Sequence, residues 1–359
     1  MGDIDKLEKI VFILGMHRSG TSALTRMVNI LGVSLGGNLL KGHHEINAKG
    51  FWENKELIAV HERILAGLNS TWFDGRPLPE HWWLRSDMSH FGDQILEILK
   101  KDFEDSPTIA LKDPRLCRLL PFWLNLLQKL GAQPYCVLTV RNPIEVWRSL
   151  QKRDGFDEGT AFQLWLTYVL EAEYYSRNLP RTLVSYDDLL TDWIGTAQKM
   201  ACDLDFEWPN SIEKVTPVIR EELTSELRHH KVTEIGKHGR DELQKKANEV
   251  YEKLISNGLD SEAYFDDARQ CLKAQAPFAH ALADALHRTN LLLVEKTKQW
   301  MSLGKAYGEL VEKYNQERER YNEKLREHDE AKKVIDEISS RRLYRVARFL
   351  SEKRTRWLK

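Results

Sequence analysis

The sequence predicts an α/β fold in which a mainly parallel sheet is flanked by helices and followed by a helical, coiled-coil-like extension at the carboxyl end. Four short apolar segments rich in β-branched residues lie within the first 190 residues, and each ends at polar side chains. Helical patterns separate these segments, and such alternation is typical of a parallel sheet covered on both faces. After about residue 210 the strand signal disappears, and the chain becomes helical and more charged.

The predicted strands are the segments KIVFILG, TIALK, YCVLTV and RTLVSY, at residues 9–15, 108–112, 135–140 and 181–186. Between the first two strands, Leu24, Val28 and Leu31 share one face of a predicted helix. Ligands of parallel α/β sheets bind at the carboxyl ends of the strands. The polar clusters that follow these strands are therefore the candidate functional site.

The overall composition excludes several classes of protein. The 359 residues carry 53 Lys and Arg against 54 Asp and Glu, a formal net charge of −1, which argues against a general nucleic-acid binder. Four widely spaced cysteines predict neither a disulfide framework nor a zinc site, and the neighbouring His43 and His44 lack a third metal ligand. The chain has no run of about 20 apolar residues. We therefore expect a cytoplasmic protein without metal or nucleic acid, either soluble or peripheral to the inner face of a membrane.

The strongest motif is the loop GMHRSGTS at residues 15–22, between the first predicted strand and a helix. Successive backbone N–H groups and the helix dipole make such a loop an anion cradle of the P-loop type. Thr21 stands where a nucleoside triphosphatase would carry its lysine, and Arg18 supplies a nearby cation instead. The candidate anion-binding residues are Gly15, His17, Arg18, Ser19, Gly20, Thr21 and Ser22.

Two further clusters follow later strands. Arg141 ends the third strand, Pro143 is suited to open the next helix, and Ser149 lies about two turns along that helix. Because arginine offers a charge-assisted fork to a phosphate, Arg141 and Ser149 form a second candidate anion site. Lys112 ends the second strand and begins a Lys-Asp-Pro-Arg segment, in which we expect Asp113 to orient its neighbours rather than to act as a base.

In combination these motifs resemble those of sulfotransferases that use 3′-phosphoadenosine 5′-phosphosulfate (PAPS), in particular the carbohydrate- and tyrosine-modifying branches. The resemblance covers residues 9 to about 210 and implies that the Arg-Ser-Gly-Thr-Ser loop holds the 5′-phosphosulfate. It also places Arg141 and Ser149 at the 3′-phosphate, and Tyr186 of the Tyr-Asp-Asp-Leu segment beside the adenine. The tryptophan that follows the loop in cytosolic members is absent, and only the segment 227–231 is a candidate for their lysine-glycine loop.

The same resemblance implies the catalytic roles. Lys112 matches the lysine of a Lys-Asp-Pro motif, and with Arg18 it would stabilise the charge that develops during sulfuryl transfer. Glu53 matches the catalytic glutamate of Golgi-type members and would deprotonate the acceptor, with His44 and Glu45 as alternatives. The start of a helix lowers the pKa of a carboxyl group, whereas burial beside aromatic neighbours raises it.

We therefore expect a PAPS-dependent sulfotransferase that acts on a hydroxyl group of a carbohydrate or glycolipid. The acceptor prediction depends on tryptophans that either stack on sugar rings or belong to the core, namely Trp52, Trp72, Trp82 and Trp83. One alternative is a P-loop kinase of small molecules, which Thr21 disfavours. The other is a non-catalytic scaffold that recruits partners through a coiled coil.

The carboxyl-terminal region shows two further patterns. A seven-residue repeat runs from Leu293 to Ile335 and predicts a coiled coil, although Glu317 and Lys324 interrupt its second stripe. The alternative is a single long helix packed on the domain. The last 20 residues carry eight basic side chains and one acidic side chain, which favours either contact with an anionic membrane or a solvated tail. We predict a sulfotransferase domain at 1–285 with its motifs at 9–210, a helix at 286–339 that forms a homo-oligomer, and a basic amphipathic tail at 340–359.

Overall fold

The computed structural model of the chain describes residues 6–40, 50–222 and 242–357. A four-stranded parallel sheet forms the centre of the fold, with strand order β2-β1-β3-β4. The strands are β1 (Lys9–Leu14), β2 (Thr108–Lys112), β3 (Gln133–Val140) and β4 (Arg181–Ser185). They coincide with the four predicted segments, and the predicted α/β class is confirmed.

Helices alternate with the strands along the chain. Those before β3 are α1 (Thr21–Ile30), α2 (Lys55–Gly67), α3 (Ser89–Phe103) and α4 (Leu116–Leu130), with short 3₁₀ turns η1 (Trp82–Leu84) and η2 (Ser86–Met88). Those after β3 are α5 (Pro143–Asp154), α6 (Glu158–Tyr175), α7 (Tyr186–Thr191), α8 (Trp193–Leu204), α9 (Ile212–Glu222), α10 (Glu242–Asn257) and α11 (Glu262–Trp357). Asn54 caps α2 and Asn142 caps α5, because each side chain accepts bonds from N–H groups of the first turn. Pro143 opens α5, as predicted.

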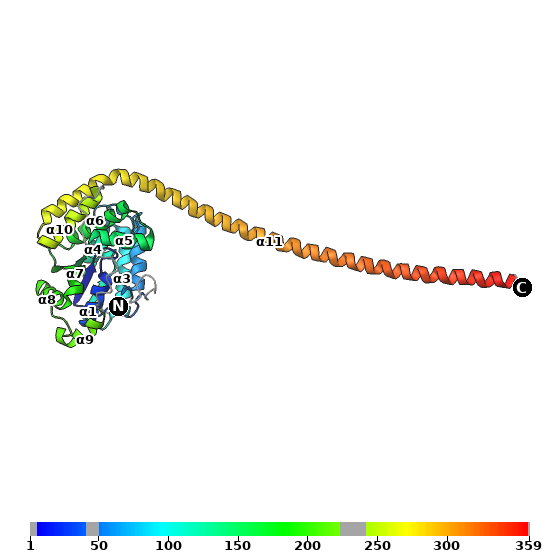
Figure 1. Ribbon diagram of the computed structural model, residues 1–359, viewed down its shortest axis with the longest axis horizontal. Coiled ribbons are helices and arrows are strands. Elements are labelled where there is room, and N and C mark those ends of the chain that lie inside the picture. The colour runs from blue at the N-terminus through cyan, green and yellow to red at the C-terminus, as the bar shows by residue number, and fades with distance from the viewer. Residues whose placement is uncertain (1–5, 41–49, 223–241, 358–359) are drawn as a thin grey trace. The chain divides into compact units, whose positions relative to one another are not determined.

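Each strand contributes to two hydrophobic cores, one on each face of the sheet, because alternate strand residues point to opposite sides. In β1, Ile10, Phe12 and Leu14 belong to one hydrophobic core, and Val11 and Ile13 belong to the other. All five are fully buried, as expected for a central parallel strand. Figure 1 shows α1, α8 and α9 on one side of the strands and α4, α5, α6 and α10 on the other.

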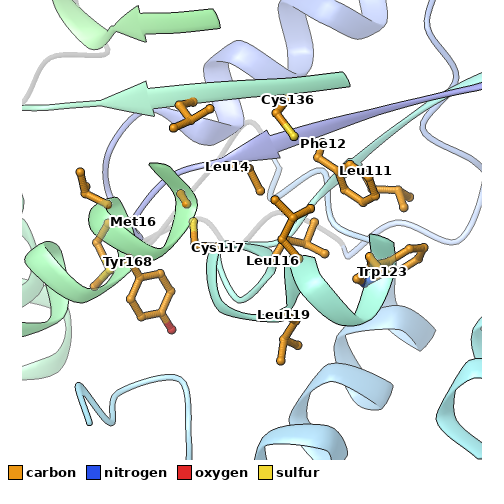
Figure 2. Close-up of a cluster of buried hydrophobic side chains, with 14 of the residues drawn as sticks. Phe12, Leu14, Met16, Leu111, Leu116, Cys117, Leu119, Trp123, Cys136 and Tyr168 are labelled. Carbon is orange, nitrogen blue, oxygen red and sulfur yellow. The ribbon is translucent and has the colours of Figure 1, made fainter. Parts of the chain in front are cut away.

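The larger core lies on the α4 side of the sheet. Figure 2 shows Phe12 and Leu111, from neighbouring strands, close to Leu116 and Trp123 of α4. The rings of Phe12 and Trp123 meet edge to face with centroids 5.7 Å apart. This packing fixes the start of α4 against β1 and β2, and so it holds the segment that follows Lys112 in place.

The strand register brings the candidate site together at one edge of the sheet. Ile13 near the end of β1 lies beside Lys112 of β2, and Val140 at the end of β3 lies beside Ser185 of β4. The loop after β1 and the residues that follow the other strands therefore begin at the same edge. This is the edge where α/β proteins bind their ligands.

The chain divides into two compact units, Met1–Leu282 and Ala283–Lys359. In the second unit, the large apolar side chains that α11 exposes between 303 and 338 fall on positions a, d, e and g of the heptad that begins at Leu293, whereas others, such as Met301 and Leu343, fall on b. Those between 303 and 338 are Leu303, Tyr307, Leu310, Val311, Tyr314, Tyr321, Leu325, Val334, Ile335 and Ile338. The predicted helical extension is thus confirmed, and its pairing in a coiled coil stays a prediction. None of the described helices has a stretch long and apolar enough to cross a membrane.

Candidate active site

The loop between β1 and α1 is shaped by two glycines. Gly20 has a φ of 89°, a left-handed conformation that glycine adopts without steric cost, and it immediately precedes the first turn of α1. A Cβ atom at Gly20 would lie 2.2 Å from Cδ2 of Tyr186, and one at Gly15 would lie 2.6 Å from Cγ2 of Thr139. The loop therefore approaches β3 and α7 more closely than any other residue type allows. Thr21 and Ser22 form the start of α1, as the predicted anion cradle requires.

Arg18 connects this loop with the second predicted anion site. Its φ of 69° is strained for a residue with a side chain. Its Nε donates to Oγ of Ser149 over 2.7 Å, and its carbonyl oxygen accepts a bond from Nη1 of Arg141 over 3.1 Å. Burial lowers the pKa of Arg18, and the positive charges of Arg153 and Arg141 lower it further. The structure thus brings three of the predicted residues into one cationic group.

Arg141 is held from two sides. Its Nε donates to Oε2 of Glu145 over 2.9 Å, and its guanidinium carbon lies 4.6 Å from the ring centre of Tyr186. Tyr186, which the family resemblance places beside adenine, is only 5% exposed and lies against both Arg141 and Gly20. Its ring therefore packs against two residues of the candidate anion site.

Arg153 is a member of the cationic group that the sequence analysis missed. It follows Ser149 by four residues in α5, so the two side chains lie on one face of the helix. Its side chain is 19% exposed and pairs with Asp154 over 2.7 Å. Its charge has a larger effect on the pKa of Arg18 than the charge of Arg141 has. The i, i+4 spacing from Ser149 is the sequence signal that identifies it.

Glu53 and Lys112, the predicted base and cation, form an ion pair. Both residues are buried, with 7% and 6% of their surface exposed. Nζ of Lys112 also donates to the carbonyl oxygen of Phe51 over 3.0 Å and to Oγ of Ser22 over 3.4 Å. Burial raises the pKa of Glu53 and prevails over the opposing charge of Lys112. The Glu53 carboxylate is therefore a better proton acceptor than an exposed glutamate.

Asp113 has the orienting role expected from the sequence. Its Oδ2 lies 2.8 Å from Nδ1 of His61, and its Oδ1 accepts bonds from N and Nη1 of Arg115, both over 2.9 Å. The indole N–H of Trp123 donates to Nε2 of His61 over 3.0 Å, so the imidazole proton lies on Nδ1 and faces Asp113. Burial favours a higher pKa for Asp113, but Arg115 and His61 outweigh it and hold this pKa below its ordinary value. Asp113 is thus an ionised support of the segment after β2 and not a proton acceptor.

Two buried polar atoms in the loop have no hydrogen-bond partner among the residues that the structure describes. They are Nε2 of His17 and Oγ of Ser19. Burial, with the nearby charge of Arg115, holds the pKa of His17 well below 6.5, so its imidazole is neutral at physiological pH. Because unsatisfied buried polar groups are rare, these two atoms are candidate contacts for a bound ligand. With the loop backbone fixed at its glycines, the site fits an anionic ligand.

The four candidate tryptophans have different surroundings. Trp82 is 1% exposed and stacks on Phe122 with centroids 5.9 Å apart, so it belongs to the core. Trp83 packs against the same core. Trp52 lies under Arg26, whose guanidinium carbon is 4.9 Å from the ring centre. Trp72 contacts the anion-binding loop through the imidazole of His17, with ring centroids 4.6 Å apart.

His44 and Glu45, the alternatives to Glu53, lie outside the described residues. The same holds for the segment 227–231, the candidate for the lysine-glycine loop. The base assignment therefore depends on the surroundings of Glu53 itself.

Comparisons with known proteins find distant structural likenesses. No protein-family model and no curated protein sequence matches the chain. A sulfotransferase domain from the curacin biosynthetic pathway is 16% identical, with a TM-score of 0.38, and the match covers 69% of this chain and 98% of that one. A sulfotransferase domain from the Synechococcus PCC 7002 olefin synthase is 19% identical, with a TM-score of 0.40, and the match covers 69% and 96%. Mouse sulfotransferase SULT7A1, solved in complex with PAP, is 15% identical, with a TM-score of 0.33, and the match covers 77% and 92%. Each of these three solved structures is a sulfotransferase or a sulfotransferase domain.

Proposed function

We propose that this protein transfers a sulfuryl group from PAPS to a hydroxyl group of a carbohydrate or glycolipid. The observation that carries the proposal is the buried pair of Glu53 and Lys112, which the bond from Lys112 to Ser22 joins to the anion-binding loop. A proton acceptor and a cation at an anion loop suit the transfer of an anionic group to a hydroxyl.

The residues present fit PAPS as the co-substrate. The loop has the two unsatisfied buried atoms and the glycine-dependent backbone that an anion cradle needs. The 5′-phosphosulfate is assigned to the loop residues Arg18, Ser19, Gly20, Thr21 and Ser22. The 3′-phosphate is assigned to Arg141, Ser149 and Arg153, which converge beside Arg18. A phosphate suits such a group because guanidinium forks bind it with charge-assisted bonds.

Different side chains of the site have different roles in the proposed reaction. When bound, PAPS supplies an activated sulfuryl group and leaves as 3′-phosphoadenosine 5′-phosphate (PAP). Glu53 accepts the proton of the acceptor hydroxyl on its carboxylate. Lys112 and Arg18 place positive charge where negative charge develops, and these contacts strengthen in the transition state. Because the pair is buried, its electrostatic effect is stronger than it would be at the surface.

Titration calorimetry with PAP and with ATP tests the co-substrate assignment. We expect PAP to bind and ATP to bind weakly or not at all, since Thr21 replaces the lysine that grips the terminal phosphates of ATP. Tight binding of ATP without binding of PAP would refute the proposal in favour of a kinase-like site.

Mass spectrometry of glycans incubated with PAPS and the protein tests the transfer. The double variant Glu53→Gln/Lys112→Met should lose the sulfated product. Its matched control is Glu56→Gln/Lys101→Met, which removes an ion pair of the same composition whose members are more exposed. Sulfation that persists in the first double variant would contradict the assigned roles.

A further inference from the structure

Three aromatic side chains, Trp72, Phe73 and Phe156, form a group beside the anion-binding loop, which we call the aromatic platform. The ring centroid of Trp72 lies 5.5 Å from that of Phe73 and 5.7 Å from that of Phe156. The centroid of the Trp72 ring also lies 4.6 Å from that of the His17 imidazole. Phe73 is 50% exposed, so the platform reaches the surface. The guanidinium carbon of Arg153 lies over the ring of Trp72, 5.6 Å from its centre.

The backbone that carries this platform is held by buried side chains beneath it. Arg118 of α4 is fully buried and donates to the carbonyl oxygens of Asp74 and Arg76, over 2.7 and 2.6 Å. The hydroxyl of Tyr168 in α6 donates to the carbonyl oxygen of Trp72 over 2.5 Å. Burial of a guanidinium group is costly unless it is well bonded, so this support is specific to the loop conformation. The platform is therefore presented in a fixed orientation.

The platform lies close to the groups that carry the proposed chemistry. His17 belongs to the same loop as Ser22, and its imidazole packs against Trp72 of the platform. The hydroxyl of Ser22 accepts a bond from Lys112 over 3.4 Å, and Lys112 pairs with Glu53, the proposed base. The anion-binding loop thus connects the platform with the groups of the proposed chemistry.

We propose that the aromatic platform and His17 form the acceptor site and bind a sugar ring of the carbohydrate that is sulfated. This inference rests on the proposed function. A sugar ring has apolar C–H faces, which pack on aromatic rings, and hydroxyl groups at its edge. Nε2 of His17 is buried without a partner among the described residues, and a hydroxyl can bond to either tautomer of a neutral imidazole. The aromatic rings thus suit the apolar C–H face of a sugar, and the nitrogen of His17 suits one of its hydroxyl groups.

Steady-state kinetics with methyl glycosides as acceptors test the assignment, with 4-nitrophenol as a phenolic acceptor that contains no sugar. Trp72→Ala and Phe73→Ala should raise the acceptor KM roughly tenfold or more, because each removes stacking area. The affinity of Phe73→Ala for PAP, measured by calorimetry, should stay within about twofold of wild type. The control is Leu84→Ala, which removes a large apolar side chain that is 63% exposed in η1, outside the platform.

Two milder variants keep the test informative if an alanine variant folds poorly. Trp72→Phe retains an aromatic face and should restore most of the acceptor affinity. Tyr168→Phe removes only the hydroxyl that holds the carbonyl group of Trp72, and it should raise the acceptor KM with little change in PAP affinity. The second variant tests the positioning of the platform rather than a contact with substrate.

The outcomes separate this inference from the function on which it rests. An acceptor KM that is unchanged in the alanine variants would overturn the platform as the acceptor site. Sulfation of 4-nitrophenol without sulfation of any methyl glycoside would overturn the sugar assignment, and so would PAP binding without transfer to any glycoside. A wild-type protein that does not bind PAP would instead refute the proposed function.

Discussion

Replacement of Arg153 by glutamine should selectively weaken the binding of ligands that carry a 3′-phosphate. Arg153 lies one helical turn beyond Ser149, and its positive charge lowers the pKa of Arg18. Glutamine removes the positive charge and retains much of the side-chain length. The matched control is Lys152→Gln, because Lys152 is adjacent, exposed and carries the same charge.

The expected loss of binding free energy for PAP follows from the surroundings of Arg153. A hydrogen bond to a charged group contributes about 1.5–3 kcal/mol. Arg153 is 19% exposed and already pairs with Asp154 over 2.7 Å, so solvent and this carboxylate both reduce its net contribution to binding. The lower part of the range, about 1.5–2 kcal/mol, is therefore appropriate, and it corresponds to a roughly 10- to 30-fold increase in the Kd for PAP.

Calorimetric titration of PAP and of adenosine 5′-phosphate separates the 3′-phosphate from the rest of the ligand. Arg153→Gln should weaken the binding of PAP by this factor and leave the binding of adenosine 5′-phosphate nearly unchanged. Lys152→Gln should change neither by more than about twofold, as expected for an exposed charge. Equal affinities of the Arg153 and Lys152 variants for PAP would refute the placement of Arg153 at the 3′-phosphate.

Three further predictions concern the base, the long helix and the tail. Burial raises the pKa of Glu53 above 4.5, so the rate of transfer should fall as the pH drops through this raised value. Glu53→Gln should be about 10²- to 10⁴-fold slower, and its pH–rate profile should lack this decrease at acid pH. Binding of PAP near that pH should take up protons in the wild type but not in Glu53→Gln, which calorimetry in buffers of different ionisation enthalpy measures. Leu310→Asp, at a heptad d position, should convert the expected oligomer to a monomer, as measured by light scattering. The control Glu319→Asp, on the outer face of the helix, should not. A monomeric wild type would contradict the coiled coil. Deletion of 340–359 should reduce flotation with anionic liposomes, and equal flotation would discard the membrane contact.

The sheet and most of the anion site could be predicted because they depend on local patterns. Each strand is a short β-branched segment, and each ends where a polar cluster begins. Parallel pairing then brings these clusters to one edge without further information. The approach of Arg18 to Ser149, which are 131 residues apart, is a consequence of this pairing. Residues that follow a strand directly are thus the ones that sequence reasoning locates well.

The supporting side chains could not be predicted because they act across the fold. Arg118 lies within a helix of strongly apolar character, and nothing in its neighbourhood indicates that it binds carbonyl groups of a loop more than 40 residues earlier. His61 of α2 bonds to Asp113, and Trp123 of α4 donates to His61, with no sequence spacing that connects the three residues. The sequence also left open whether each tryptophan belongs to the core or to a surface. The contacts of Trp82 answer that question for this residue, which belongs to the core.

Buried carboxylates of the protein pair with two of the cations of the site. Lys112 pairs with Glu53 and Arg141 pairs with Glu145, and all four residues are buried. A bound anion therefore competes with a carboxylate, and a ligand with several negative charges competes best. At Lys112 the competition has a second effect, because movement of the ammonium group towards an anion weakens the contact that lowers the pKa of Glu53. This competition predicts that binding of the proposed co-substrate and activation of the proposed base are coupled through Lys112, so that Glu53 is a stronger proton acceptor when the anion is present.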